Sequence, residues 1–406
     1  MRYDFDKVTD RRTSNSIKWA VLEQELPMWV ADMDFETAPE IKEAILKRAE
    51  HGIFGYPGIP DEWYNAYIKW WEERHHFQFE KEWLMFTTGI VPAISCAVRK
   101  LTTIGENVLV QTPVYNAFFH CITNNGRNIV NAPLKYDGEN YWIDFEELEQ
   151  KLSDPLTTLM ILCNPHNPIG KIWDKKTLAK IGELCFKHHV TVLSDEIHCD
   201  LTEPDRAYIP FGSVSEICKN ISVTCIAPTK SFNLAGIHTA AVVAADEALR
   251  NKMWHALNTD EIARPNVFAV DAAIAAFMKG GPWLDALREY ISKNKQLARE
   301  FLQKNVPEIK VTPSEATYLM WLDCSRLIKD RKDFSDNSEL NCFLREKTGL
   351  FVTGGKQYGK GGEDFLRMNV ACPRSLVEDG LSRLCKGAAL YKELFIYNSL
   401  VKKSSR

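Results

Sequence analysis

The chain has 406 residues, which at about 150 residues per domain predicts two domains or three. Its 45% hydrophobic and 26% charged residues are the proportions of an ordinary globular protein. Because 50 Lys and Arg nearly balance 54 Asp and Glu, the composition argues against a broad nucleic-acid binder or membrane-surface binder.

The N-terminal sequence and the cysteines indicate a cytoplasmic protein. Residues 1–7 (MRYDFDK) carry acids where a signal peptide needs an apolar run, and no stretch reaches the roughly 18 apolar residues of a membrane span. None of the 11 cysteines forms a C-x-x-C pair, so no metal site is predicted. Several of them, such as Cys163, Cys225 and Cys324, lie in apolar runs and are interpreted as reduced core residues.

The middle of the chain alternates apolar segments with amphipathic ones. The predicted strands are 107–112, 158–163, 190–194, 222–226 and 239–245. The predicted helices are 93–101, 144–152 and 174–188, of which the last two begin at an Asp suited to an N-cap. Continuous apolar strands separated by helices are typical of an α/β fold, with a parallel or mixed sheet covered on both faces.

After about residue 280 the pattern changes to that of a smaller α+β domain. A long charged helix is expected over 283–304, followed by short strands at 310–311 and 318–323 and a helix at 338–347. We therefore expect a domain boundary near residue 280.

Three predicted strands run directly into polar segments. They are followed by 164–170 (NPHNPIG), 195–198 (DEIH) and 227–233 (APTKSFN). In open α/β sheets ligands bind at the carboxyl ends of the strands, so these segments mark a candidate site.

Each polar residue has a structural and a functional interpretation. A lysine beside buried strands, such as Lys230, tends to lose its proton and can form a Schiff base with an aldehyde, but a surface loop lysine is commoner. Asp195 is placed to hold a pyridine nitrogen protonated, or to cap the next turn. Asn167 is placed to donate to a phenolate oxygen, or to build a proline turn.

Two upstream segments are weaker candidates. Residues 87–93 (TTGIVPA) precede a helical run, and free N–H groups at a helix N-terminus bind anions. Tyr115 follows a strand end and is suited to stack on an aromatic cofactor, although an aromatic residue there is more often part of the core.

Together these motifs resemble the fold-type I pyridoxal-5′-phosphate (PLP) enzymes, the aspartate aminotransferase superfamily. The ordered series TTG, TPVY, NPHNPxG, SDEIH, PTKSF and FLR carries the resemblance and spans nearly the whole chain. It implies that Lys230 binds the cofactor aldehyde covalently, that Asp195 pairs with the pyridine nitrogen and Asn167 with the 3′-oxygen, and that Tyr115 stacks on the ring. It further implies that Gly89, Ile90 and Val91, with the hydroxyl of Thr229, hold the phosphate, and that Arg367 grips the substrate α-carboxylate.

A closer resemblance is to the MalY/PatB-type carbon–sulfur lyases, the cystathionine β-lyase-like branch. It rests on 27–35 (PMWVADMDF), 54–57 (FGYP), 194–198 (SDEIH) and 365–374 (FLRMNVACPR). In that family the tyrosine corresponding to Tyr56 reaches the phosphate of the neighbouring subunit's cofactor, which implies a homodimer with shared active sites.

We accordingly expect three regions. They are an N-terminal segment 1–45 that associates with the small domain, a large PLP-binding domain 46–280 and a C-terminal small domain 281–406.

Two positions depart from the common aminotransferase pattern. Residue 198 is His where a Tyr is usual, so one hydrogen bond to the cofactor oxygen is altered. Residue 238 is His where many aminotransferases place a phosphate-binding Arg. Both departures agree with the lyase branch, and His198 is kept as a cofactor-binding candidate.

The resemblance implies a PLP-dependent β-lyase that cleaves L-cystathionine or related cysteine S-conjugates to pyruvate, ammonia and a thiol. Because the same lysine serves both reactions, an aminotransferase of aromatic or broad amino-acid specificity remains the first alternative. A PLP-binding regulator or interaction protein with little turnover is the second. Under either enzyme hypothesis the partner is a small amino-acid substrate, with no nucleic acid and no membrane.

Overall fold

The structure is a computed structural model that describes residues 3–328 and 340–404. The described residues form two compact units. The large unit consists of Glu36–Arg288 and Glu315–Thr317, and the small unit of the described residues within Met1–Phe35, Glu289–Ser314 and Tyr318–Arg406. The division into functional domains at residues 45 and 280 stays a prediction.

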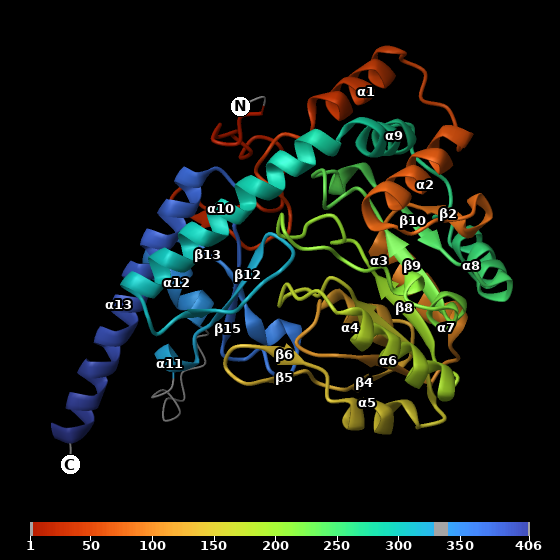
Figure 1. Cartoon of the computed structure of the whole chain (residues 1–406). Helices are drawn as coiled ribbons and strands as arrows, with labels where there is room; N and C mark the ends of the chain where they lie inside the picture. The colour runs from red at the N-terminus through yellow and green to blue at the C-terminus, as the bar shows by residue number, and fades with distance from the viewer. Residues whose placement is uncertain (1–2, 329–339, 405–406) are drawn as a thin grey trace. The chain divides into compact units, whose positions relative to one another are not determined.

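A seven-stranded mixed sheet forms the centre of the large unit (Figure 1). Its order is β2 (Leu84–Thr87), β10 (Ala240–Val243), β9 (Ser222–Ile226), β8 (Thr191–Asp195), β7 (Thr157–Cys163), β3 (Asn107–Val110) and β4 (Asn128–Asn131). β10 is antiparallel to both of its neighbours, and the other neighbouring pairs are parallel. The predicted α/β fold with a parallel or mixed sheet is confirmed.

Helices cover both faces of this sheet. The α-helices that lie wholly within the large unit are α1 (Pro39–Glu50), α2 (Asp61–His75), α3 (Ile90–Leu101), α4 (Ala117–Thr123), α5 (Phe145–Leu152), α6 (Lys175–Lys187), α7 (Glu216–Asn220), α8 (Glu247–Thr259) and α9 (Ala269–Lys279). Alternate residues of β7 point to opposite faces, since the side-chain period of a strand is two. Leu159 and Ile161 join the core under α3, α4 and α8, whereas the Met160 sulfur lies 3.8 Å from the Cys185 thiol of α6.

The predicted N-caps are present. The Asp144 carboxylate accepts hydrogen bonds from the amides of Glu146 and Glu147, and the Asp174 carboxylate accepts one from Thr177. Each therefore satisfies N–H groups that the first turn of its helix leaves without an acceptor. A short pair, β5 (Lys135–Tyr136) and β6 (Tyr141–Trp142), precedes α5.

The small unit contains a four-stranded antiparallel sheet. Its order is β11 (Lys310–Val311), β12 (Leu319–Asp323), β15 (Phe365–Asn369) and β14 (Thr353–Gly354), and β1 (Leu26–Pro27) pairs separately with β13 (Leu350–Phe351). Its other helices are α11 (Ser325–Ile328), α12 (Leu340–Thr348) and α13 (Arg374–Ser404). The predicted helix 283–304 is α10 (Gly281–Asn305), which is divided between the two units at Arg288. The first two residues of the predicted helix 338–347 lie outside the described residues.

The cysteines are free thiols, and all are buried except Cys342 and Cys385. Cys163, Cys225 and Cys324 lie in the core, as predicted. None of the helices in the described ranges combines the length and apolar composition needed to cross a membrane.

Candidate active site

Six strands of the large unit end at the same edge of the sheet. β3, β4, β7, β8 and β9 are parallel, and β2 has the same direction because β10 is antiparallel to both β2 and β9. The predicted residues follow these strand ends in order, with Gly89 after β2, Tyr115 after β3, Asn167 after β7, Asp195 ending β8, and Thr229 and Lys230 after β9. The sheet therefore brings segments that are far apart in sequence to one edge.

Asp195 occupies the centre of this edge. Its Cα pairs with Cys163 of β7 and Cys225 of β9, and its side chain is buried. Burial raises the pKa of its carboxyl to about 7, although a hydrogen bond from the Ile197 amide (3.2 Å) and the nearby charge of Lys230 both lower it. Asp195 is thus a buried acid whose surroundings only partly stabilise its charge.

Asn167 follows β7, whose last residue, Cys163, pairs with Asp195. The Asn167 amide donates to the Cys163 sulfur (3.3 Å), and both residues are buried. Burial, with the Asp195 charge as a second cause, raises the pKa of the Cys163 thiol far above its ordinary value. The turn closes at Gly170, whose φ of 68° favours glycine and whose amide donates to the His166 carbonyl (2.7 Å).

Lys230 lies in the turn after β9, where its side chain is partly exposed. The turn is held by main-chain hydrogen bonds from the Phe232 amide to the Pro228 carbonyl and from Leu234 to Thr229, both 2.9 Å. These hydrogen bonds fix the position of the Lys230 backbone at the sheet edge.

Ser231, the residue after Lys230, is linked to helix α2 through the buried carboxylate of Asp200, which the sequence analysis did not identify. Asp200 accepts hydrogen bonds from the Ser231 hydroxyl (2.8 Å), the Trp70 indole (2.9 Å) and His75 Nε2 (2.9 Å). These partners lower the pKa of Asp200 in spite of its complete burial. The partners lie 31 to 130 residues from Asp200 in sequence, so no local pattern could have identified them.

Glu196 is a second buried carboxyl that the sequence reasoning did not single out. It accepts hydrogen bonds from the Ser194 hydroxyl (2.7 Å), the Phe211 amide (2.9 Å) and the Tyr208 hydroxyl. Burial raises the pKa of Glu196 to about 8. Its position directly after Asp195 was the available signal.

The N-terminus of α3 has the form expected of an anion site. Gly89 is its N-cap and has no side chain to satisfy the N–H groups of the first turn, which lack acceptors within the helix. Ile90 is buried and Val91 is exposed, while the Thr229 side chain is buried. The partial positive charge of the helix end adds to these donors.

The other predicted residues have different surroundings. Tyr115 packs edge to face on Phe118 (5.7 Å between ring centres) and is partly buried, and His198 is buried in the turn after β8. Tyr56 is 100% exposed on the irregular segment between α1 and α2, and His238 is exposed too.

Arg367 belongs to the small unit. It is buried on β15, where its guanidinium donates to the Trp29 carbonyl (3.0 Å) and lies over the Tyr358 ring (5.0 Å). It therefore has a defined orientation within its own unit.

The residues at the sheet edge fit the cofactor that the sequence resemblance implies. PLP carries a pyridine nitrogen, an aldehyde and a phosphate. The Asp195 carboxyl, whose raised pKa reflects incomplete stabilisation, suits a cationic ring nitrogen. The Lys230 amine suits the aldehyde, and the first turn of α3 suits the phosphate.

We expect the free energy of unfolding of the cofactor-free protein to fall as the pH rises from about 5 to 7. The Asp195 carboxyl loses its proton near pH 3.8 in the unfolded chain and near 7 in the native protein, so the native state binds more protons in this interval. Urea unfolding at several pH values measures the slope, and Asp195→Asn should reduce it. Glu196 adds a slope of the same sign, and the buried His166, whose pKa is lowered to about 3, adds one of the opposite sign, so the difference between wild type and variant isolates Asp195. An identical slope in wild type and variant would contradict the pKa assignment.

Known proteins match almost the whole chain. Residues 26–384 match the family described as aminotransferase class I and II. The chain is 43% identical over 387 residues to cystathionine beta-lyase PatB of Bacillus subtilis, covering 94% of this chain and 98% of that protein. It is 33% identical over 390 residues to protein MalY of Escherichia coli, with the same coverage.

A solved structure agrees with these relatives. Cystalysin from Treponema denticola, which contains pyridoxal 5′-phosphate, aligns with a TM-score of 0.91 at 33% identity, covering 95% of this chain and 99% of that one. The resemblance inferred from the strand-end motifs is confirmed, and the chain belongs to the aminotransferase class I and II family.

Proposed function

We propose that the protein is a PLP-dependent carbon–sulfur β-lyase. It cleaves L-cystathionine or a related cysteine S-conjugate to pyruvate, ammonia and a thiol, which is homocysteine for cystathionine. The names of PatB and of its cystathionine-cleaving relatives support this reaction over transamination. The structural observation that carries the proposal is the position of Asp195 at the end of β8 and of Lys230 in the turn after the neighbouring parallel strand β9, where the lysine charge acts on the Asp195 carboxyl.

The reactive groups have distinct tasks in this proposal. Bound PLP supplies an aldehyde that joins to amines and a protonated ring that accepts electron density. Lys230 holds the aldehyde at rest and takes the substrate's α-proton as general base. Asp195 keeps the ring nitrogen protonated, Asn167 donates to the 3′-oxygen, and Tyr115 stacks on the ring.

The phosphate is held by the large unit. The backbone N–H groups of Gly89, Ile90 and Val91 and the Thr229 hydroxyl are its proposed donors. His198 lies in the turn that follows Asp195 and is a further cofactor contact.

Arg367 is proposed to bind the substrate's α-carboxylate through its planar guanidinium. We expect Arg367→Ala to lower kcat/KM for L-cystathionine about 10- to 100-fold, since a hydrogen-bonded charge pair contributes about 1.5–3 kcal/mol. Most of the loss should lie in KM, and the PLP content should be unchanged. Steady-state kinetics and cofactor absorbance measure both. A loss confined to PLP content would contradict this role.

A homodimer with shared active sites is proposed from the segment that carries Tyr56. Ile53, Phe54 and Tyr56 are 67%, 58% and 100% exposed in one chain, which is unusual for a run of large apolar residues. A second copy of the chain covers them in this proposal, with Tyr56 reaching the partner's cofactor. The free, mostly buried thiols support a cytoplasmic location.

The test is whether product formation depends on a keto acid. The PLP-loaded protein is given L-cystathionine and other cysteine thioethers, with and without 2-oxoglutarate. A β-lyase releases pyruvate without the keto acid. An aminotransferase needs the keto acid and aminates it, and a PLP-binding regulator does neither. Failure to release pyruvate from any thioether would overturn the proposal.

A further inference from the structure

Residues 28–33 of the small unit have no regular secondary structure, yet each of their six carbonyls accepts a hydrogen bond. Asn369 supplies three of the donors: its backbone N–H donates to the Met28 carbonyl, and its side-chain amide donates to the carbonyls of Val30 and Asp32. The Trp29 carbonyl accepts from the Arg367 guanidinium and the Thr353 hydroxyl. The Ala31 carbonyl accepts from the Tyr318 hydroxyl, and the Met33 carbonyl accepts from Arg11. The segment is therefore held in one conformation along its whole length.

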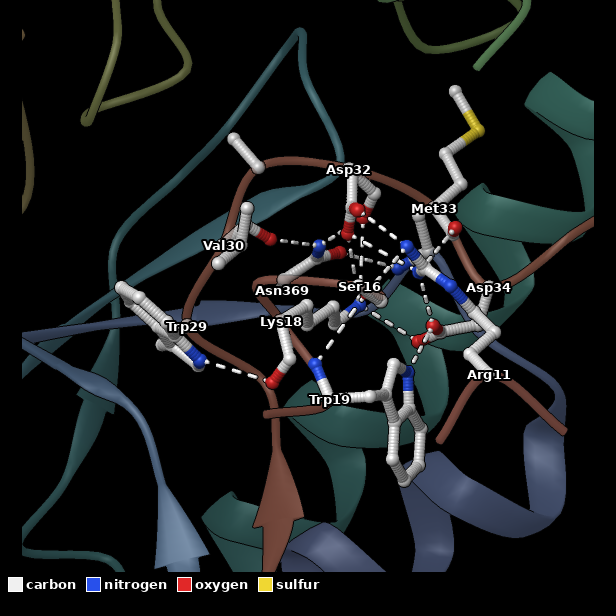
Figure 2. A network of polar contacts seen from close by, with 12 residues as sticks. Arg11, Ser16, Lys18, Trp19, Trp29, Val30, Asp32, Met33, Asp34 and Asn369 are labelled. Atoms are coloured by element: carbon white, nitrogen blue, oxygen red, sulfur yellow. Dashed lines mark hydrogen bonds and ion pairs between the residues drawn. The ribbon is translucent and has the colours of Figure 1, made fainter. Parts of the chain in front are cut away.

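A buried ion network fastens the end of this segment, as Figure 2 shows. Asp34 lies 2.6 Å from the Lys18 ammonium, and its other oxygen accepts from Arg11 (2.7 Å) and the Trp19 indole (2.8 Å). Arg11 also pairs with Asp32 at 2.6 Å. Lys18 and Asp34 are only 1% and 4% exposed, so water screens their charges little.

A buried ion network of this kind contributes little net free energy to the stability of the folded protein. Removing two charges from water costs about as much as their attraction returns, so apolar replacements of buried ion pairs are often equally stable. What charged and directional contacts provide is one specified arrangement of the groups around them. Arg11 and Lys18 lie 23 and 16 residues before Asp34 in sequence. Their ion pairs with Asp34 therefore fix the end of the segment 28–34 to a distant part of the small unit and so set its path.

The held segment contacts Arg367 directly. The Trp29 carbonyl accepts from Arg367 Nη2 at 3.0 Å and from the Thr353 hydroxyl at 3.1 Å. Trp29 is itself held, because its indole N–H donates to the Lys18 carbonyl (3.3 Å) and its ring stacks on Phe351 at 4.8 Å. Moving the segment would move the oxygen that orients the guanidinium.

We propose that Lys18 and Asp34 are positioning residues for Arg367. The Lys18–Asp34 pair sets residues 28–34, the Trp29 carbonyl orients Arg367, and Arg367 thereby presents its guanidinium to a carboxylate. This inference rests on the proposed function, in which Arg367 binds the substrate's α-carboxylate. It predicts that a buried ion pair of the small unit controls affinity for one chemical group of the substrate.

The test compares two ligands that differ only in that group. L-Alanine and ethylamine both react through an amine, but ethylamine lacks the carboxylate. Their affinities for the PLP-loaded protein are measured from the absorbance of the bound cofactor. We expect Asp34→Asn to weaken L-alanine binding about tenfold and to leave ethylamine binding unchanged, with PLP content as in wild type. Equal weakening of both ligands would overturn the proposal.

A double-mutant cycle separates this inference from the role of Arg367. In an Arg367→Ala background, Asp34→Asn should change L-alanine affinity less than about twofold, because the group that it positions is gone. If the two losses simply multiply, Asp34 does not act through Arg367 and the positioning role fails alone. If Arg367→Ala leaves L-alanine affinity unchanged, the carboxylate role fails and the inference falls with it.

A milder variant replaces Asp34→Asn if that protein does not fold, and a control variant tests whether the loss of any ion pair has the same effect. Asp32→Asn alters a side chain that is 20% exposed, so it serves in the same cycle if Asp34→Asn does not fold. We expect the same selective loss of L-alanine binding, smaller in size. Glu308→Gln breaks the Glu308–Lys392 ion pair (2.5 Å) elsewhere in the small unit and should change neither affinity. A selective loss in this control would show that any lost ion pair has the effect and would overturn the inference.

Discussion

Replacing Lys230 by Ala is expected to lower turnover of L-cystathionine at least about a thousandfold. The change removes the amine that holds the cofactor and the base that takes the α-proton, and general base catalysis alone contributes about 10²- to 10⁴-fold. Pyruvate release by the PLP-loaded variant measures the loss. The variant should also release PLP on dialysis, because its aldehyde no longer has a covalent partner.

The matched control is Lys176→Ala, which removes an exposed lysine of α6. We expect its turnover and PLP retention to equal those of wild type. Turnover at the wild-type rate in Lys230→Ala would contradict the assignment of Lys230 under the lyase and the aminotransferase hypotheses alike.

Replacing Asp195 by Asn is expected to lower kcat about 100- to 1000-fold, the usual loss on removing one preorganised electrostatic group. The variant keeps the size of the side chain and the acceptor for the Ile197 amide, but loses the charge that keeps the ring nitrogen protonated. Because the substrate-binding groups are unchanged, KM should change far less than kcat.

The control for this change is Asp246→Asn, which removes a carboxylate at the N-cap of α8 in the same unit. Its kcat should match wild type, with at most a small loss of stability. A kcat for Asp195→Asn equal to that of the control would show that the Asp195 charge does not serve the reaction.

The local part of the fold was predictable because each element carries its own pattern. The strand ending at Cys163 is a continuous apolar run, and its helix partner begins at Asp174, which caps it as expected. Asn167, Asp195 and Lys230 were predicted as site residues for a similar reason, since each lies at or shortly after the end of an apolar strand, and their roles stay predictions. The carboxyl-end rule then places them at one edge once the strands are parallel.

The long-range part was not predictable from such patterns. The reversed direction of β10 depends on its pairing with β2, more than 150 residues away. The structural role of Asp200 depends on its hydrogen bonds with Trp70 and Ser231, and that of Asp34 depends on its ion pair with Lys18. Contacts of this kind leave no periodic trace in the sequence, because each partner is a single polar residue in an otherwise ordinary segment.

The proposed reaction breaks a carbon–sulfur bond by β-elimination. The most direct measurement follows pyruvate, ammonia and homocysteine together, from L-cystathionine and PLP-loaded protein with no keto acid added. We expect equal amounts of all three, rising through many turnovers per subunit. Product formation that stops at about one equivalent per subunit and resumes only with an added keto acid would contradict it.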